Sequence, residues 1–217
     1  MGELRIRPLL VAGNTKLGMS IFHFDLPAIG TCPGSTELCR RVCYASQGRY
    51  LLSSVKERLD WNYKMSKRCD FADQLAEEIR RKGCLVIRPH CSGDFYSAEY
   101  AKQWLSVMKR CPQTRFYFYT RSYRVPEIAE VLEQMAALSN VRVWYSMDCE
   151  TEVPERVPAG VRLAYLQIEE GEKPEVLDLL FVVRKLRREA QRMSLPLLCP
   201  HEADKAESCG ACQKCFR

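Results

Sequence analysis

Two short groups of cysteines, one near each end of the chain, constrain its fold more than any other feature. They hold six of the twelve cysteines. The first group is Cys32, Cys39 and Cys43, in a loop at residues 31–45, and the second is Cys209, Cys212 and Cys215. Soft thiolates gathered in this way select zinc or iron–sulfur clusters. The spacing therefore predicts a metalloprotein.

Length and composition favour metal binding over disulfide cross-linking. A chain of 217 residues buries roughly 70% of its unfolded surface and needs no cross-links to fold. The first residues lack the long apolar stretch of a signal peptide, and no run approaches the roughly 18 apolar residues that cross a membrane. We expect one cytoplasmic domain over residues 1–217, with no membrane association and with reduced cysteines.

Apolar patterns predict strands that alternate with helices. Helices are expected at residues 50–66, at residues 71–82 with a stop at Gly83, around Trp104 and around Leu132. Strands are expected at residues 20–24, 85–87, 116–119, 141–145, 161–168 and 195–198. This alternation is typical of a parallel α/β sheet with helices outside it. The pattern allows an open doubly wound sheet or a (β/α)6 partial TIM barrel.

The densest basic stretch lies at residues 184–192. Apolar residues recur every three or four positions from Val176 to Met193, which predicts one amphipathic helix. Its charged side chains form either a solvated outer face or a surface for nucleic acid or an acidic partner. The net charge of +6 is mild and does not separate these interpretations.

The second cysteine group has the spacing of iron–sulfur ligands. Cys209-x2-Cys212-x2-Cys215 matches three ligands of a ferredoxin-type [4Fe–4S] site, and Cys199-Pro200 matches the distant Cys-Pro ligand. Zinc sites more often use two separate C-x2-C pairs. The tail at residues 199–217 therefore favours iron, with zinc as the alternative.

The first cysteine group supplies only three thiolates. A cubane held by three cysteines leaves one iron open to a substrate or cofactor, as catalytic metal sites keep a vacant position. The alternatives are a fourth ligand from Cys91, His90 or Cys149, or a structural zinc ion.

Polar residues follow the expected strands at the points where these end. His90, Ser92, Gly93 and Asp94 follow the second strand, Arg121 the third, and Asp148 the fourth. In parallel α/β folds the active site forms at this edge of the sheet. Helix capping explains any one of these residues alone, but their convergence beside thiolates predicts a shared functional rim.

Several of these motifs together resemble a known family. They are Thr31-Cys32-Pro33-Gly34, Cys43-Tyr44-Ala45, Ser92-Gly93-Asp94-Phe95, Tyr119-Thr120-Arg121-Ser122, Ser146-Met147-Asp148 and the terminal cysteine tail. In this order they resemble the gene-product-88 domain proteins of phages and plasmids. The resemblance covers nearly the whole chain and implies an architecture more than a reaction.

More distantly, the layout is similar to that of radical S-adenosylmethionine enzymes, which carry three cysteines after the first strand of a (β/α)6 partial barrel. That resemblance implies a cofactor site at His90, Ser92, Gly93 and Asp94, with Asp94 accepting hydrogen bonds from the ammonium of S-adenosylmethionine. Arg121 and Asp148 would then position a polar or anionic substrate. The C-x6-C-x3-C spacing here differs from the usual C-x3-C-x2-C.

Together these observations predict an iron–sulfur protein with two [4Fe–4S] clusters. Cys32, Cys39 and Cys43 would hold the first, and Cys199, Cys209, Cys212 and Cys215 the second. One interpretation is a radical-SAM-like enzyme that receives electrons from a donor and acts on an unknown substrate. The alternative is a non-catalytic electron-transfer or redox-sensing nucleic-acid-binding protein of a mobile element.

Overall fold

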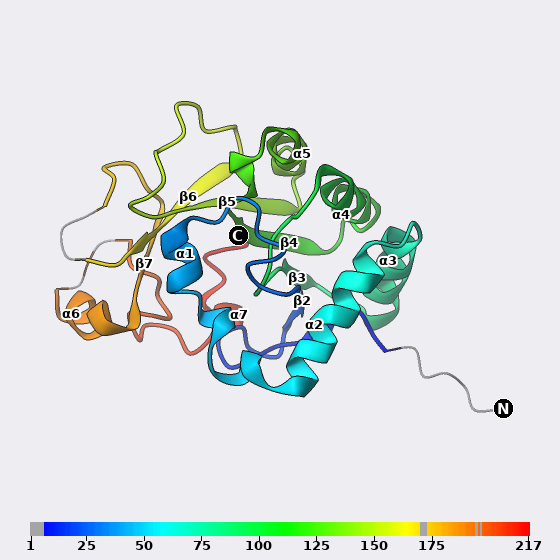
Figure 1. Ribbon diagram of the computed structural model, residues 1–217, viewed down its shortest axis with the longest axis horizontal. Helices are drawn as coiled ribbons and strands as arrows, with labels where there is room; N and C mark the ends of the chain where they lie inside the picture. The colour runs from blue at the N-terminus through cyan, green and yellow to red at the C-terminus, as the bar shows by residue number, and fades with distance from the viewer. Residues whose placement is uncertain (1–6, 170–172, 194, 196) are drawn as a thin grey trace.

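The computed structural model describes residues 7–169, 173–193, 195 and 197–217. Within them, one sheet of seven strands runs through the molecule in the order β1-β2-β3-β4-β5-β6-β7 (Figure 1). The strands are Val11–Ala12, Ile21–Phe24, Val86–Pro89, Arg115–Thr120, Val141–Met147, Val161–Gln167 and Leu179–Val182. β1 is antiparallel to β2, and every later neighbour pair is parallel.

The sequential strand order argues against one of the two expected architectures, the doubly wound sheet. Each parallel strand pairs with the next one along the chain, whereas a doubly wound sheet reverses its strand order at a switch point. The sheet is therefore singly wound. The carboxyl ends of β2 to β7 meet at one edge, where the polar residues that follow them can approach one another.

The helices lie mainly in the first two thirds of the chain. They are α1 (Glu37–Arg41), α2 (Ser53–Ser66), α3 (Phe71–Lys82), α4 (Ala98–Arg110), α5 (Pro126–Ala136), α6 (Arg187–Arg192) and α7 (Cys209–Cys212). The expected alternation holds from β2 to β5, and Gly83 ends α3 in the left-handed conformation with φ 60°. It fails after β5, because residues 148–160 contain no helix. Pro154 and Pro158 in that connection oppose helix formation.

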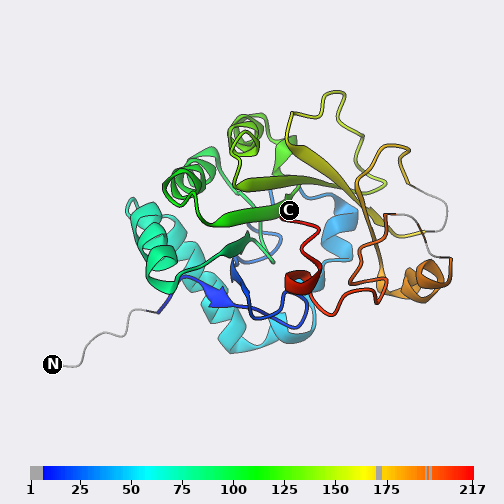
Figure 2. The ribbon, with the colours of Figure 1, turned by 180° about the vertical axis from the view of Figure 1, so that it is seen from behind.

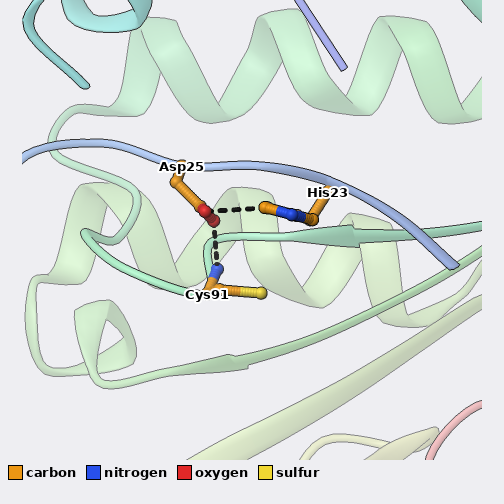
Figure 3. Close-up of side chains that lie close together, drawn as sticks. All are labelled: His23, Asp25 and Cys91. Carbon is orange, nitrogen blue, oxygen red and sulfur yellow. Dashed lines mark hydrogen bonds and ion pairs between the residues drawn. The ribbon is translucent and has the colours of Figure 1, made fainter. Parts of the chain in front are cut away.

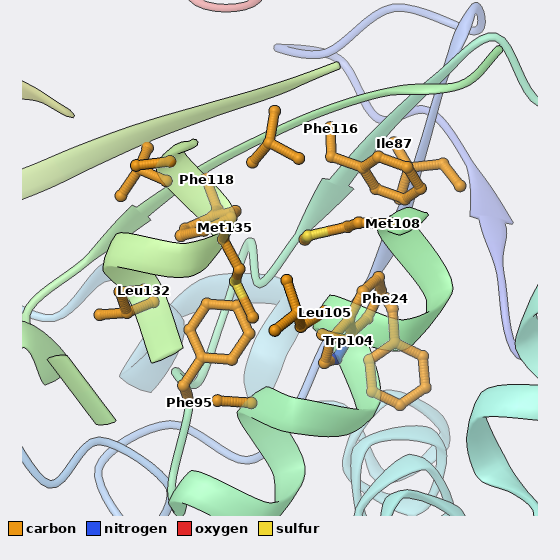
Figure 4. Packing of buried hydrophobic residues seen from close by; sticks show 14 of the residues in the cluster. Phe24, Ile87, Phe95, Trp104, Leu105, Met108, Phe116, Phe118, Leu132 and Met135 are labelled. Atoms are coloured by element: carbon orange, nitrogen blue, oxygen red, sulfur yellow. The ribbon is translucent and has the colours of Figure 1, made fainter. Parts of the chain in front are cut away.

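Alternating residues of the sheet build two different apolar clusters. On one face, which we call the helical face, strand residues such as Phe24 and Phe118 pack against Trp104 of α4 and Met135 of α5 (Figure 4). The opposite face, which we call the tail face, contributes Ile21, Tyr117, Trp144 and Leu179. Cys199, Cys209, Cys215 and Phe216 cover it, and Figure 2 shows the red C-terminal segment running across it.

The prediction of one amphipathic helix from Val176 to Met193 is wrong. Leu179–Val182 forms strand β7, and α6 begins only at Arg187, after a 3-10 turn at Arg184–Leu186. The apolar run Leu-Leu-Phe-Val is compatible both with a strand buried on its two faces and with the apolar face of a helix. Arg184, Lys185, Arg188 and Arg192 are exposed.

Two further strand predictions need correction. The expected strand at 195–198 is reduced to an isolated parallel bridge between Leu198 and Leu180, and residues 194 and 196 lie outside the described residues. Strand β1 was not predicted, because two residues are too short for a periodic signal. In the described part of the chain, no helix is long and apolar enough to cross a membrane.

Candidate metal-binding sites

The first cysteine group lies in a loop that the polar strand ends hold in place. Thr36 caps α1 by accepting a hydrogen bond from the amide of Cys39, and its hydroxyl donates to Asp148 Oδ2 at 2.7 Å. Gly34 lies so close to β4 that an added Cβ would stand 1.9 Å from the carbonyl oxygen of Arg121. The loop therefore rests directly on the carboxyl edge of the sheet.

Asp94 joins the loop to the ends of β3 and β4. Its carboxylate accepts hydrogen bonds from the Thr120 hydroxyl at 2.7 Å, the Arg121 amide at 2.9 Å and the Phe95 amide at 2.8 Å. Burial raises the pKa of Asp94, and these hydrogen bonds offset only part of that rise. The carboxylate is thus engaged by the chain's own donors.

Arg121 and Asp148 form a buried ion pair beneath the loop. Arg121 Nη1 lies 3.0 Å from Asp148 Oδ2, and the Asp148 side chain is fully buried. The contact is not aligned as a hydrogen bond, so Nη1 has no hydrogen-bond partner. Arg121 also acts electrostatically on Cys39. The two residues predicted to position a substrate therefore bind each other.

The three thiols of the loop are half-buried and interact electrostatically with one another. Burial, with a further contribution from Asp94, raises the pKa of Cys32 to about 12. Burial also raises the pKa of Cys39, although Arg121 opposes it. A metal that binds here must therefore displace protons from these thiols.

The cofactor residues predicted from the segment after β3 lie in two different places. His90 is buried on the helical face, with its ring centroid 4.6 Å from that of Phe95 and Nε2 2.8 Å from the Tyr100 hydroxyl. Burial lowers the pKa of His90 to about 3. Ser92 and Gly93 instead pack against the segment before the cysteine loop, where the Ser92 hydroxyl donates to the carbonyl of Leu26 at 2.7 Å.

The second cysteine group lies on the tail face. Cys199, Cys209 and Cys215 are buried and Cys212 is half-buried, and electrostatic interactions link Cys209 to Cys199 and Cys212, and Cys215 to Cys199 and Cys209. The hydroxyl of Tyr119 donates to the sulfur of Cys215 at 2.9 Å, and Trp144 Nε1 donates to its carbonyl at 2.9 Å. Burial raises the pKa of Cys215 to about 11.

His23, Asp25 and Cys91 lie close together near β2 and β3 (Figure 3). Asp25 accepts from the Cys91 amide at 2.7 Å, and its other oxygen lies 2.7 Å from His23 Nδ1. His23 Nε2 lies 3.2 Å from the carbonyl oxygen of Gly13. Since that carbonyl can only accept, both ring nitrogens donate, and His23 is an imidazolium paired with Asp25.

Among the described residues, this trio forms a group of potential metal ligands whose donor atoms all lie within 4.8 Å of one another, and neither cysteine group does so. Two of the three groups, His23 and Asp25, already form an ion pair with each other. The sulfurs of each cysteine group are spread more widely than the roughly 3.8 Å that separates two thiolates on one tetrahedral zinc ion.

Sequence reasoning missed three residues of these sites. They are Asp25, Tyr119 and Arg88, of which Arg88 sits on β3 opposite His23 in the strand register. The available signal for Arg88 was its position in the strand Val86–Pro89, where a charged residue alternates with apolar ones. Cys91, a predicted alternative ligand of the first group, instead interacts electrostatically with Asp25, Arg88 and Cys209.

Comparison with known proteins gives one family. The profile of the family described as Gene product 88 matches residues 8–217. A protein named Gene 88 protein of Mycobacterium phage L5 is 28% identical over 149 residues, which cover 63% of this chain and 61% of that protein. Its namesake in Mycobacterium phage D29 is 26% identical over 149 residues, covering 63% and 60%. The matched region thus spans about 60% of each relative's length. No solved structure matches.

Proposed function

The chain belongs to the gene product 88 family, and we propose that this member is an iron–sulfur protein with two [4Fe–4S] clusters. The ligands of the first would be Cys32, Cys39 and Cys43, and those of the second Cys199, Cys209, Cys212 and Cys215. The seven cysteines of the two groups are free thiols, which suits the reducing cytoplasm in which we expect the protein to work.

One observation carries the proposal: a buried arginine acts electrostatically on the thiols of each cysteine group. Nη1 of Arg121 makes no aligned hydrogen bond, although it lies 3.0 Å from the Asp148 carboxylate, and Nε of Arg88 has no hydrogen-bond partner. Buried donors are rarely left unpaired without a reason such as a missing ligand. A cluster with thiolate ligands is anionic, and its sulfurs accept hydrogen bonds, so it would satisfy both arginines.

The spacing of the thiols does not match a preformed site for a single zinc ion. In neither group do three sulfurs lie within 4.8 Å of one another in the described part of the chain. Four ligands of one zinc ion share a single centre, whereas the ligands of a cubane bind different irons at its corners and stand further apart. The Tyr119 hydrogen bond to the Cys215 sulfur is also of a kind that tunes iron–sulfur clusters.

The clusters would supply electrons and, at the three-cysteine site, an open iron position. We propose that a radical-SAM-like partial barrel would use that position for S-adenosylmethionine, and Asp94 would have to give up one of its three hydrogen bonds to accept from the ammonium. A cavity of about 330 Å³, lined in part by Asp148, Cys149 and Tyr165, lies at the ends of β5 and β6. This volume is at the lower end of that of small-molecule sites and could hold a polar substrate.

A second candidate is a non-catalytic iron–sulfur protein that binds nucleic acid. It is favoured by the exposed cationic side chains of Arg184, Lys185, Arg188 and Arg192 on and before α6. Binding through these residues would weaken steeply with salt. Loss of that salt dependence in a variant with all four residues changed to Gln would support this candidate, and unchanged binding would exclude it.

Metal analysis of protein purified without oxygen tests the proposal. We expect about eight irons and eight sulfides per chain. Cys39→Ala and Cys212→Ala should each remove one half of them, while Cys69→Ala, at an exposed cysteine outside both groups, should remove none. Added S-adenosylmethionine should change only the spectrum that Cys39→Ala abolishes. Zinc without sulfide would refute the iron–sulfur assignment.

A further inference from the structure

The tail face of the sheet is strongly cationic. The side chains of its strands alternate in direction, and the positions on this face include His23, Arg88, Arg115, Arg142 and Arg162 but no Asp or Glu. Arg162 lies over Trp144, with its guanidinium carbon 5.4 Å from the ring centroid. The cysteine tail therefore folds onto a surface that favours negative charge.

Arg88 is the cation of this face that lies among the thiols. Its guanidinium carbon is 5.2 Å from the ring centroid of Tyr119 and 5.9 Å from that of Tyr117. It also acts electrostatically on the sulfurs of Cys209 and Cys215. Tyr119, which stacks under the guanidinium, in turn donates to Cys215. Arg88 thus lies on the tail face within electrostatic range of two thiols of the second cysteine group, and it also interacts electrostatically with Cys91 and Tyr44.

Within the described part of the chain, no ion pair neutralises the charge of Arg88. Among the described residues, no carboxylate lies within ion-pair distance of it, and its Nε has no hydrogen-bond partner. Asp25 interacts with it only at longer range. The two oxygens of Asp25 are occupied by His23 and by the amide of Cys91. The hydroxyl of Tyr117, beside Arg88, is also buried and unpaired.

We propose that Arg88 is the counter-charge and positioning residue of the second cluster, and that it sets the reduction potential of that cluster. This inference rests on the proposed function. Reduction adds an electron to an already anionic centre, so a nearby fixed cation stabilises the reduced form more than the oxidised form. Net charge and hydrogen bonds to sulfur are the levers by which a protein tunes such potentials.

Redox titration of the full-length, iron-loaded protein tests the inference. The signal to follow by paramagnetic resonance, with dithionite as reductant, is the one that survives Cys39→Ala. Arg88→Gln should lower the equilibrium constant for reduction of this cluster about tenfold, which is a shift of 59 mV to more negative potential. Arg88→Lys, which keeps the charge, should shift it much less. Arg115→Gln makes the same charge change on the same face at an exposed position and serves as the control.

The outcomes separate this inference from the proposed function. Suppose that the wild type contains two clusters and that the second cluster has the same potential in the Arg88→Gln and Arg115→Gln proteins. This result would overturn the role of Arg88 and leave the proposed function standing. If Arg88→Gln loses its iron, retention of iron by Arg88→Lys supports the counter-charge, and loss of iron from both folded variants overturns it. A wild type without iron would refute the proposed function, and the inference with it.

Discussion

The hydroxyl of Thr36 donates a hydrogen bond of 2.7 Å to the carboxylate of Asp148, across 112 residues of sequence. This contact joins the first turn of the cysteine loop to the end of β5. Arg121, at the end of β4, pairs with the same carboxylate at 3.0 Å. The loop is therefore held by buried charge as well as by packing, and its stability depends on the strand ends.

Asp148→Asn should destabilise the protein by about 3–5 kcal/mol, because it leaves the buried Arg121 guanidinium without a counter-charge. The matched control is Asp73→Asn, which breaks a pair with Arg110 in which the Asp73 side chain is 71% exposed. That change should cost about 0–1 kcal/mol. Unfolding of both variants in urea measures the difference, and equal costs would contradict the assigned role of Asp148.

Gly34→Ala should displace the cysteine loop. The added methyl group would meet the carbonyl of Arg121 at 1.9 Å, and because that atom belongs to the backbone of β4's end it cannot move aside cheaply. We expect a loss of several kcal/mol and loss of metal from the first cysteine group only. Gly30→Ala is the control, since nothing lies within 4 Å of a Cβ there; it should be neutral or slightly stabilising. Similar melting temperatures for the two variants would count against this packing.

Local sequence patterns predicted most helices and strands of the first two thirds of the chain, but they did not predict β7 or the position of the C-terminal segment. Helices such as α3 and α4 were predicted correctly from the period of their apolar residues and from their capping residues. The run that became β7 was assigned to a helix because its apolar residues fit both periods. The coverage of the tail face by the C-terminal segment depends on contacts such as Tyr119 to Cys215, between residues far apart in sequence, and no local pattern encodes them.

For the candidate site, too, the sequence predicted where residues lie along the sheet but not which side chains they contact. Sequence analysis predicted that Asp94, Arg121 and Asp148 lie at one edge of the sheet, because the carboxyl ends of parallel strands lie together. It could not reveal that Arg121 pairs with Asp148, or that His90 turns to the helical face with φ 61°. Both depend on side-chain packing between elements, which is decided only when the sheet and α4 assemble.

Tyr119→Phe and Tyr117→Phe should change the free energy of unfolding by different amounts, although each removes one tyrosine hydroxyl. In metal-free protein, the Tyr119 hydroxyl donates to Cys215, so its loss should cost about 1 kcal/mol. The Tyr117 hydroxyl is buried without a partner, so its loss should be neutral or stabilising. Urea unfolding of the metal-free proteins measures both, and a larger cost for Tyr117→Phe would reverse our interpretation of the tail face.

His90 should make the metal-free protein less stable in acid. Burial lowers its pKa from 6.5 to about 3, so below pH 6.5 the unfolded chain binds a proton that the folded chain does not. Stability should therefore fall as the pH drops from 6.5 towards 3, by a few kcal/mol in total. His90→Asn keeps a residue that tolerates positive φ and should flatten this slope. Unfolding free energies at several pH values between 7 and 4 provide the test, and an unchanged slope would contradict it.

His23 should make the protein less stable as the pH rises, which is the opposite of the effect of His90, and it should do so above pH 6.5. Burial lowers its pKa, but the hydrogen bond and charge of Asp25 outweigh this effect, and the net pKa is raised above 6.5. The stabilisation from the imidazolium–carboxylate pair is therefore complete below pH 6.5 and is lost as the pH rises through the raised folded-state pKa. The Gln side chain of His23→Gln cannot be protonated, so the free energy of unfolding of this variant should lack the decline above pH 6.5. The slope below pH 6 separates this effect from that of His90, which is still present in the His23→Gln protein. A decline above pH 6.5 of equal size in wild type and variant would show that the pair in Figure 3 is not ionised.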